Sequence, residues 1–250
     1  MKQITQIIIV VCALSGTIAC RKKPVVPESP VLGSVTVDLD ANLNIVRNKE
    51  TVIGNMICDA VMNDMVNKGK TVDFVMVNGG NIRFSASKRP NGIYPAGAIT
   101  AGEVDEMLPF GDASVIVKVN GKQLKEILER SCAQLPLSMG PFMQLSKQIK
   151  VKIDPTKSPQ LLSVDENSIT SAGNRVVSVT INDAPLDSLA EYKVVLPSYI
   201  AEGNDGYVTL KNISAGKKEN LGENQANAVK EYITVFSPLT PVLDGRVSFQ

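Results

Sequence analysis

The sequence predicts a single mixed α+β domain, in which helices cover a mixed β-sheet. Stretches with apolar residues at helical spacing alternate along the chain with short apolar runs typical of strands. Pro, Gly and Asn separate these runs, as expected for short elements joined by turns. No internal repeat is present and no linker-like composition follows residue 34, so we expect one folded unit over residues 34–250.

Four helices and eight strands account for most of the pattern. Apolar residues at helical spacing predict the first helix, and Gly69-Lys70 is the signal that terminates it. A Thr-x-x-Glu signal, Thr100 and Glu103, predicts the start of the second helix. The predicted helices cover residues 51–67, 100–107, 122–134 and 224–236. The predicted strands cover residues 34–39, 72–77, 114–119, 148–153, 176–181, 192–196, 207–210 and 246–249.

Composition excludes several classes of function. The chain has 250 residues, of which 44% are hydrophobic, and its net charge is +1, which indicates a globular protein with a sizeable core and not a binder of nucleic acid polymers. It contains no histidine, the commonest metal ligand and the usual general base near neutral pH. We therefore expect no catalytic residue, no metal site and no cofactor bound by this chain.

The N-terminal segment has the features of an export signal. Lys2 precedes an apolar run over residues 7–14, and the segment ends at Thr17-Ile18-Ala19-Cys20. It resembles a bacterial lipoprotein signal, which implies lipidation of Cys20 and a protein held at a membrane of the cell envelope, periplasmic or on the cell surface. We assign residues 1–20 to the signal and residues 21–33 to a Pro-rich tether. A plain secretory signal or an uncleaved anchor are the alternatives.

Two cysteines remain outside this segment, Cys58 and Cys132, and both fall in predicted helices. In an exported protein they can form a disulfide, or each can be a buried free thiol. The sequence leaves both alternatives open.

The chain is organised around residues 72–83, VDFVMVNGGNIR. The uninterrupted apolar run is typical of a strand that is covered on both faces. Gly79 and Gly80 follow it, and glycine permits either a positive φ or the close approach of a ligand to the backbone. Asn78 and Arg83 flank this turn with an amide and a guanidinium. From these residues alone, an ordinary turn is the alternative.

Six motifs follow one another in a recognisable order. They are Gly54-Asn55 with Asp59, NGGNIR at 78–83, LPFG at 108–111, GPFMQLS at 140–146, GNRVVSV at 173–179 and LPSYIAEGNDGY at 196–207. Together they resemble the C-terminal, substrate-specificity domain of the 5'-nucleotidases, over residues 47–249. In that family this domain binds the nucleoside part of a nucleotide, while a separate metallophosphoesterase domain holds two metals and cleaves the phosphate.

The resemblance implies roles for individual residues. Phe110 and Tyr199 would sandwich the base, and Asp205 would accept hydrogen bonds from ribose hydroxyls. Guanidinium groups would face the phosphate, and the amide of Asn78 would donate toward the substrate. The substrate-binding residues expected on this basis are Arg47, Asn78, Gly80, Arg83, Phe110, Tyr199 and Asp205.

Departures from the family pattern lie close to these residues, among them Asn204, which stands where glycine is commoner directly before Asp205. Asn81 stands where a small residue is usual and is expected to narrow the loop. Asp112 stands where a neutral residue is usual and is expected to place negative charge near an anionic ligand.

Three hypotheses for function follow. The first is a nucleotide-recognition subunit of a split 5'-nucleotidase, with a metallophosphatase chain that supplies the divalent metals in trans and contacts the turn at 78–83. The second is a surface lipoprotein that captures nucleosides or nucleotides without chemistry. The third is a domain that keeps the fold while its site has decayed into a structural surface.

Overall fold

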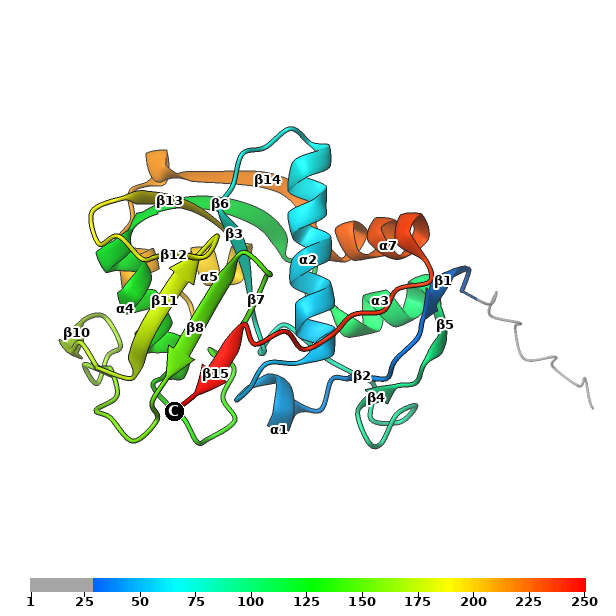
Figure 1. Ribbon diagram of the computed structural model, residues 1–250, viewed down its shortest axis with the longest axis horizontal. Helices are drawn as coiled ribbons and strands as arrows, with labels where there is room; N and C mark the ends of the chain where they lie inside the picture. Colours follow the sequence, from blue (N-terminus) through cyan, green and yellow to red (C-terminus); the bar gives the residue numbers. More distant parts are fainter. Residues whose placement is uncertain (1–28) are drawn as a thin grey trace, which may run out of the picture.

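A five-stranded mixed sheet organises the structure, a computed structural model that describes residues 29–250 (Figure 1). In spatial order its strands are β14 (Lys218–Asn224), β6 (Ala113–Asn120), β13 (Glu191–Pro197), β3 (Phe74–Asn78) and β7 (Met143–Leu145). Strand β3 is parallel to β13 and antiparallel to β7, and the other neighbours are antiparallel. The mixed sheet expected from the sequence is thus confirmed.

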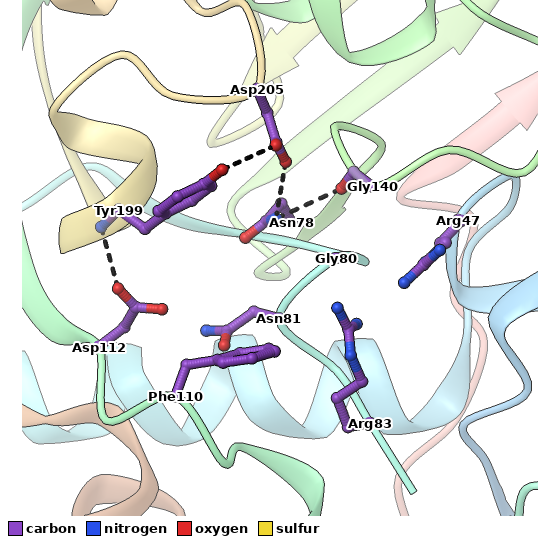
Figure 2. A pocket seen from close by; sticks show the side chains of 10 residues that line it. All are labelled: Arg47, Asn78, Gly80, Asn81, Arg83, Phe110, Asp112, Gly140, Tyr199 and Asp205. Carbon is purple, nitrogen blue, oxygen red and sulfur yellow. Dashed lines mark hydrogen bonds between the residues drawn. The ribbon is translucent and has the colours of Figure 1, made fainter.

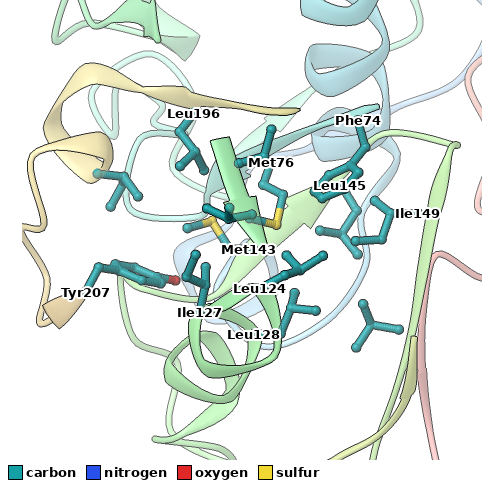
Figure 3. Packing of buried hydrophobic residues seen from close by; sticks show 14 of the residues in the cluster. Phe74, Met76, Leu124, Ile127, Leu128, Met143, Leu145, Ile149, Leu196 and Tyr207 are labelled. Carbon is teal, nitrogen blue, oxygen red and sulfur yellow. The ribbon is translucent and has the colours of Figure 1, made fainter. Parts of the chain in front are cut away.

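Strand β3 is buried along its whole length, as its apolar run predicts. Side chains of a strand point alternately to the two faces of the sheet. Phe74 and Met76 therefore pack into one hydrophobic core, and Val75 and Val77 pack into another on the opposite face. Figure 3 shows the first core, where Phe74 and Met76 lie among side chains of β7 and α4.

Helices cover both faces of this sheet. The longer ones are α2 (Val52–Asn67), α3 (Ala101–Met107), α4 (Gly121–Cys132) and α7 (Gln225–Phe236). Helix α7 packs against α2 and α3 on one face, and α4 lies on the other (Figure 1). The short ones are α1 (Leu43–Val46), α5 (Ser198–Ala201), α6 (Val208–Lys211) and the 3-10 turn η1 (Ala215–Lys217).

The remaining strands form smaller sheets. A four-stranded sheet has the order β12 (Ala184–Pro185), β11 (Val176–Ile181), β8 (Ile149–Ile153) and β15 (Val247–Phe249). The two-stranded sheets pair β1 (Val31–Val35) with β5 (Gly97–Thr100), β2 (Leu39–Asp40) with β4 (Ile93–Tyr94), and β9 (Leu161–Leu162) with β10 (Ile169–Ser171).

The structure tests only those N-terminal predictions that concern residues from 29 onward. The signal over residues 1–20, with Cys20, and the first part of the tether lie outside the described residues. Strand β1 begins at Val31, within the range assigned to the tether, so the folded unit starts before residue 34. Within residues 29–250, no helix combines the length and the hydropathy needed to cross a membrane.

Each of the four helices predicted from the sequence begins and ends within two residues of a helix in the structure. Helix α3 begins with the predicted capping box, in which Thr100 Oγ1 accepts from the Glu103 N–H (3.3 Å) and Glu103 Oε2 accepts from the Thr100 N–H (2.8 Å). The strand predicted at 207–210 is wrong, because residues 208–211 form α6. A four-residue apolar run does not distinguish a strand from a buried helical turn.

Strands at the sheet edge were harder to predict. Strand β14 was missed because its sequence, KENLGEN, is polar and lies at the exposed edge of the sheet. The strand predicted at 34–39 is divided between β1 and β2.

Both remaining cysteines are buried free thiols, so the disulfide alternative is wrong. Burial raises the pKa of each thiol, that of Cys132 to about 12. Neither is therefore a reactive thiolate near neutral pH.

A buried carboxylate joins α4 to the four-stranded sheet. Glu129 is 1% exposed and accepts hydrogen bonds from the backbone N–H groups of Arg175 (2.9 Å) and Val176 (3.0 Å). The Arg175 guanidinium in turn donates to backbone carbonyls at the end of α4 and just beyond it, among them that of Cys132 (2.8 Å). This network fixes the end of α4 to the start of β11.

We expect Glu129→Gln to lower the free energy of unfolding by about 1–3 kcal/mol, because it places an NH₂ group against a buried backbone N–H. Urea denaturation at neutral pH measures the change. Glu231, an exposed residue of α7, provides the matched control, since Glu231→Gln should change the free energy by less than about 0.5 kcal/mol. Equal stability of the two variants would contradict the structural role of Glu129.

Candidate functional site

All seven residues expected to bind substrate line one cavity of about 420 Å³, a size typical of small-molecule sites (Figure 2). Three further residues line it: Asn81, Asp112 and Gly140. The lining comes from five separate parts of the chain, which meet at the end of β3. The nucleotide-binding roles of these residues remain predictions, but the structure brings the residues together.

The turn after β3 forms one wall of this cavity. Its two glycines are required because other backbone segments approach the turn too closely to leave room for a side chain. A Cβ added at Gly79 would lie 2.1 Å from the carbonyl oxygen of Val46. One added at Gly80 would lie 2.9 Å from the carbonyl oxygen of Gly140. Neither glycine has a positive φ, so of the two properties that glycine offers, the absence of a side chain is the one used here. The chain's own segments, around Val46 and Gly140, approach the turn closely.

A buried glutamine holds the segment that carries Arg47. Gln144 Nε2 donates to the carbonyl oxygens of Val46 (2.8 Å) and Lys49 (2.7 Å), and its Oε1 accepts from the Thr51 N–H (3.0 Å). A Cβ at Gly54 would overlap the Gln144 side chain at 2.2 Å. The Gly54 motif and the glutamine of GPFMQLS therefore act together to place Arg47, a link that the linear sequence does not reveal.

Two guanidinium groups lie at one end of the cavity. Neither Arg47 nor Arg83 forms an ion pair with a carboxylate of residues 29–250, and Arg47 Nε is buried without a hydrogen-bond partner there. Burial lowers the pKa of both, and the charge of Arg47 lowers that of Arg83 further. Arginine nevertheless stays charged. Two mutually repelling cations without an ion-pair partner make this end suited to an anion.

Two aromatic rings line the cavity from separate loops. Phe110 follows α3 and is 60% exposed, and Tyr199 lies in α5 and is 46% exposed. Figure 2 shows them on facing sides of the cavity. The Arg83 guanidinium lies 4.9 Å from the centre of the Phe110 ring, a cation–π contact. Neither ring is part of the core, and both are available to a flat ligand.

Two carboxylates hold Tyr199 in place. Asp112 Oδ1 accepts from the Tyr199 N–H and from the Ser198 hydroxyl, both at 2.9 Å, so it caps the first turn of α5. The Tyr199 hydroxyl donates to Asp205 Oδ1 at 3.2 Å. Figure 2 shows Asp112 on the side of the cavity away from Arg47, and the expectation that its charge lies near an anionic ligand stays a prediction.

Asp205 lies in a strained turn that lines the cavity. Its φ is +57°, a conformation that aspartate adopts more readily than most residues, and its carbonyl accepts from Arg130 Nε at 2.9 Å. Its Oδ2 lies 3.5 Å from Asn78 Nδ2, which also donates to the Gly140 carbonyl at 3.3 Å. The Asn78 amide, expected to donate toward substrate, thus also positions Asp205 and Gly140. Strained residues of this kind cluster at functional sites.

No metal-ligand set forms within residues 29–250, where no three side chains among His, Cys, Asp and Glu come close enough to hold an ion. The chemistry of the residues that line the cavity suits a planar group, an anion and hydroxyl groups.

Comparison with known proteins places the chain in a family. Residues 31–212 match the family model described as the 5'-nucleotidase C-terminal domain. The chain belongs to this family. It is 32% identical over 234 residues to a snake venom 5'-nucleotidase of Macrovipera lebetinus, covering 88% of this chain, and 31% identical over 231 residues to the 5'-nucleotidase of Mus musculus, covering 87%.

The fold agrees with that assignment. The crystal structure of a 5'-nucleotidase precursor from Thermus thermophilus matches with a TM-score of 0.74 and 30% identity, covering 88% of this chain and 39% of that one. The Haemophilus influenzae NAD nucleotidase, at 20% identity and a TM-score of 0.69, shares the fold. This chain spans about half of the Macrovipera protein (52%) and 36% of the mouse protein.

We expect the Tyr199 phenol to keep its proton up to about pH 9, because burial and the nearby Asp205 carboxylate raise its pKa above the usual value of about 10. A raised pKa means that the neutral form, which donates to Asp205, persists as the pH rises. The difference in tyrosinate absorbance between the wild type and Tyr199→Phe should show a midpoint above about pH 10. A midpoint below that value would show that the Tyr199–Asp205 contact does not persist in solution.

Proposed function

We propose that this domain binds the nucleoside part of a nucleotide in the cavity, and that a separate metallophosphatase chain supplies the metal centre that hydrolyses the phosphate ester. The observation that supports this most is that all seven residues expected from the family motifs line one cavity. Two exposed rings line the cavity, and two guanidiniums without ion pairs to the described residues lie beside them, that of Arg83 against the Phe110 ring.

Each part of a nucleotide has a matching feature. A base would stack between Phe110 and Tyr199, since a flat π-face accepts any base. Asp205 would accept from ribose hydroxyls, because a carboxylate has about four lone-pair sites and Tyr199 and Asn78 occupy only two. The phosphate would lie against Arg47 and Arg83, with a partner's divalent metals and attacking water on its other side.

This arrangement also indicates where the partner would bind. Both chains must contact one substrate, so the interface would include the turn at 78–83 next to the arginines. Lipidation of Cys20, outside the described residues, would hold the complex at a membrane of the bacterial cell envelope.

The second candidate is capture of nucleosides or nucleotides without chemistry. It is favoured by one observation: every contact inferred for the base and the ribose comes from this chain, so the cavity does not need a partner to bind a nucleoside.

We expect Phe110→Ala and Tyr199→Ala each to weaken binding of adenosine about 5- to 150-fold, since stacking contributes about 1–3 kcal/mol per base. Isothermal titration calorimetry measures the affinities. Tyr199→Phe keeps the ring and should remain within a few-fold of the wild type. Phe249→Ala removes an exposed ring outside the cavity and is the matched control. Unchanged affinity in both alanine variants would favour a decayed site.

We expect the chain to raise the rate at which a metallophosphatase releases phosphate from nucleoside monophosphates such as AMP. The measurement compares the mixture with each protein alone, and the chain carrying both Phe110→Ala and Tyr199→Ala should give no gain. The metallophosphatase to test is the one encoded nearest to this gene. If the chain binds nucleosides tightly but does not raise the rate of phosphate release by that enzyme, capture is favoured over the split enzyme.

A further inference from the structure

The last turn of α4 contacts two of the segments that line the cavity, although none of its own residues lines it. Arg130 Nε donates to the carbonyl oxygen of Asp205 at 2.9 Å. The Ser131 hydroxyl accepts from the N–H of Met143 at 2.8 Å, in the segment that begins with Gly140. Helix α4 is itself fixed to β11 by a buried carboxylate. The end of α4 is therefore placed to determine where both segments lie.

Arg130 is a buried cation without a carboxylate partner. The residue is 9% exposed, and its guanidinium forms no ion pair within residues 29–250. Its bond to the Asp205 carbonyl is the only hydrogen bond that its side chain makes with the described residues. Burial of a charge that gains no ion pair is costly, so stability alone does not explain an arginine at this position.

The turn that Arg130 contacts has an unfavourable backbone conformation. The φ angles are +93° at Gly203, +57° at Asp205 and +77° at Gly206, a region that residues other than glycine rarely adopt. The guanidinium lies directly against the turn, because a Cβ added at Gly206 would lie 2.6 Å from Arg130 Nη2. Among the described residues, only Arg130 donates to the Asp205 carbonyl. This bond therefore stabilises the conformation of the turn.

The place of the Asp205 carboxylate depends on that conformation. Its Oδ1 accepts from the Tyr199 hydroxyl at 3.2 Å, and its Oδ2 lies 3.5 Å from Asn78 Nδ2 (Figure 2). Both distances are long for hydrogen bonds, so a small movement of the turn would break both contacts. The side-chain contacts are thus too weak to hold Asp205 by themselves, and the contact of its backbone with Arg130 is needed.

From these contacts we infer, on the basis of the proposed nucleotide-binding function, that Arg130 is a positioning residue for the ribose. Through the Asp205 carbonyl it holds the Asp205 carboxylate where that group can accept from the ribose hydroxyls. Without the bond from Arg130, the carboxylate would move away from Tyr199 and Asn78. The cavity would then no longer distinguish a ribose from a sugar that lacks these hydroxyls.

Adenosine and 2',3'-dideoxyadenosine test this, because the second ligand lacks both hydroxyls. Calorimetric titration of the wild type should show about 10- to 150-fold tighter binding of adenosine, the factor expected for hydrogen bonds to a charged group. Arg130→Met removes the donor and should lower this ratio of affinities by about 5-fold or more. Both ligands are titrated into the same sample, so a loss of folded protein changes the number of sites and not the ratio.

Arg130→Gln separates the hydrogen bond from the charge. Glutamine Nε2 is as many bonds from Cα as arginine Nε, so it can donate to the Asp205 carbonyl while it carries no charge. We expect this variant to keep the ratio of the wild type. Lys125→Gln, which removes a positive charge from an exposed position of the same helix, is the matched control and should also keep it. An equal loss in Arg130→Gln and Arg130→Met, or no loss in either, would overturn the positioning role.

A second measurement needs no ligand. Burial and the Asp205 carboxylate raise the pKa of Tyr199, so displacement of Asp205 should lower the midpoint of its tyrosinate absorbance. We expect a lower midpoint in Arg130→Met and not in Arg130→Gln, with Tyr199→Phe in each background to identify the signal.

The two measurements distinguish the possible failures. If the wild type binds neither ligand, the nucleotide-binding function is overturned, and if it binds both equally, the ribose contact of Asp205 is overturned. In either case the midpoint still decides whether Arg130 positions Asp205, since an unchanged midpoint in Arg130→Met would show that it does not.

Discussion

The structure around the cavity depends on the close approach of three backbone segments at the end of β3. The Gly79 N–H donates to the Phe142 carbonyl at 2.7 Å and the Gly80 N–H to that of Gly140 at 2.9 Å, while the Val46 carbonyl lies where a Cβ of Gly79 would be. A side chain at either glycine would separate these segments, and the loops that carry Arg47 and Gly140 would move away from the turn. The cavity exists because the turn has no side chains at these two positions.

The turn is held in place because the strand before it, β3, is buried on both faces. Strand β3 contributes alternate residues to two hydrophobic cores, so any movement of its end would disturb both. The residues that line the cavity lie mostly on loops and short helices beyond this strand. Loops positioned by a rigid sheet are where binding residues are usually found.

Charge is distributed unevenly along the cavity. In Figure 2, Arg47 and Arg83 lie on one side of the cavity and Asp112 on the other, and Asp205 lies beside Tyr199 and Asn78. Tyr199 links the two carboxylates, through its backbone to Asp112 and through its hydroxyl to Asp205. A ligand with an anionic group beside Arg47 and Arg83 complements this arrangement.

The sequence alone determined the fold class, the buried strand β3, the helices with clear periodicity or capping, and seven of the ten residues that line the cavity. These features depend on local patterns, or on motifs long enough to identify a family. The tertiary structure decided the rest. Gln144 and Gly140 came to light only with the fold, since their roles depend on contacts with segments distant in the chain. The helical state of 208–211, the polar strand β14 and the free state of Cys58 and Cys132 were likewise set by packing, because short or polar segments carry too little local preference to specify their own structure.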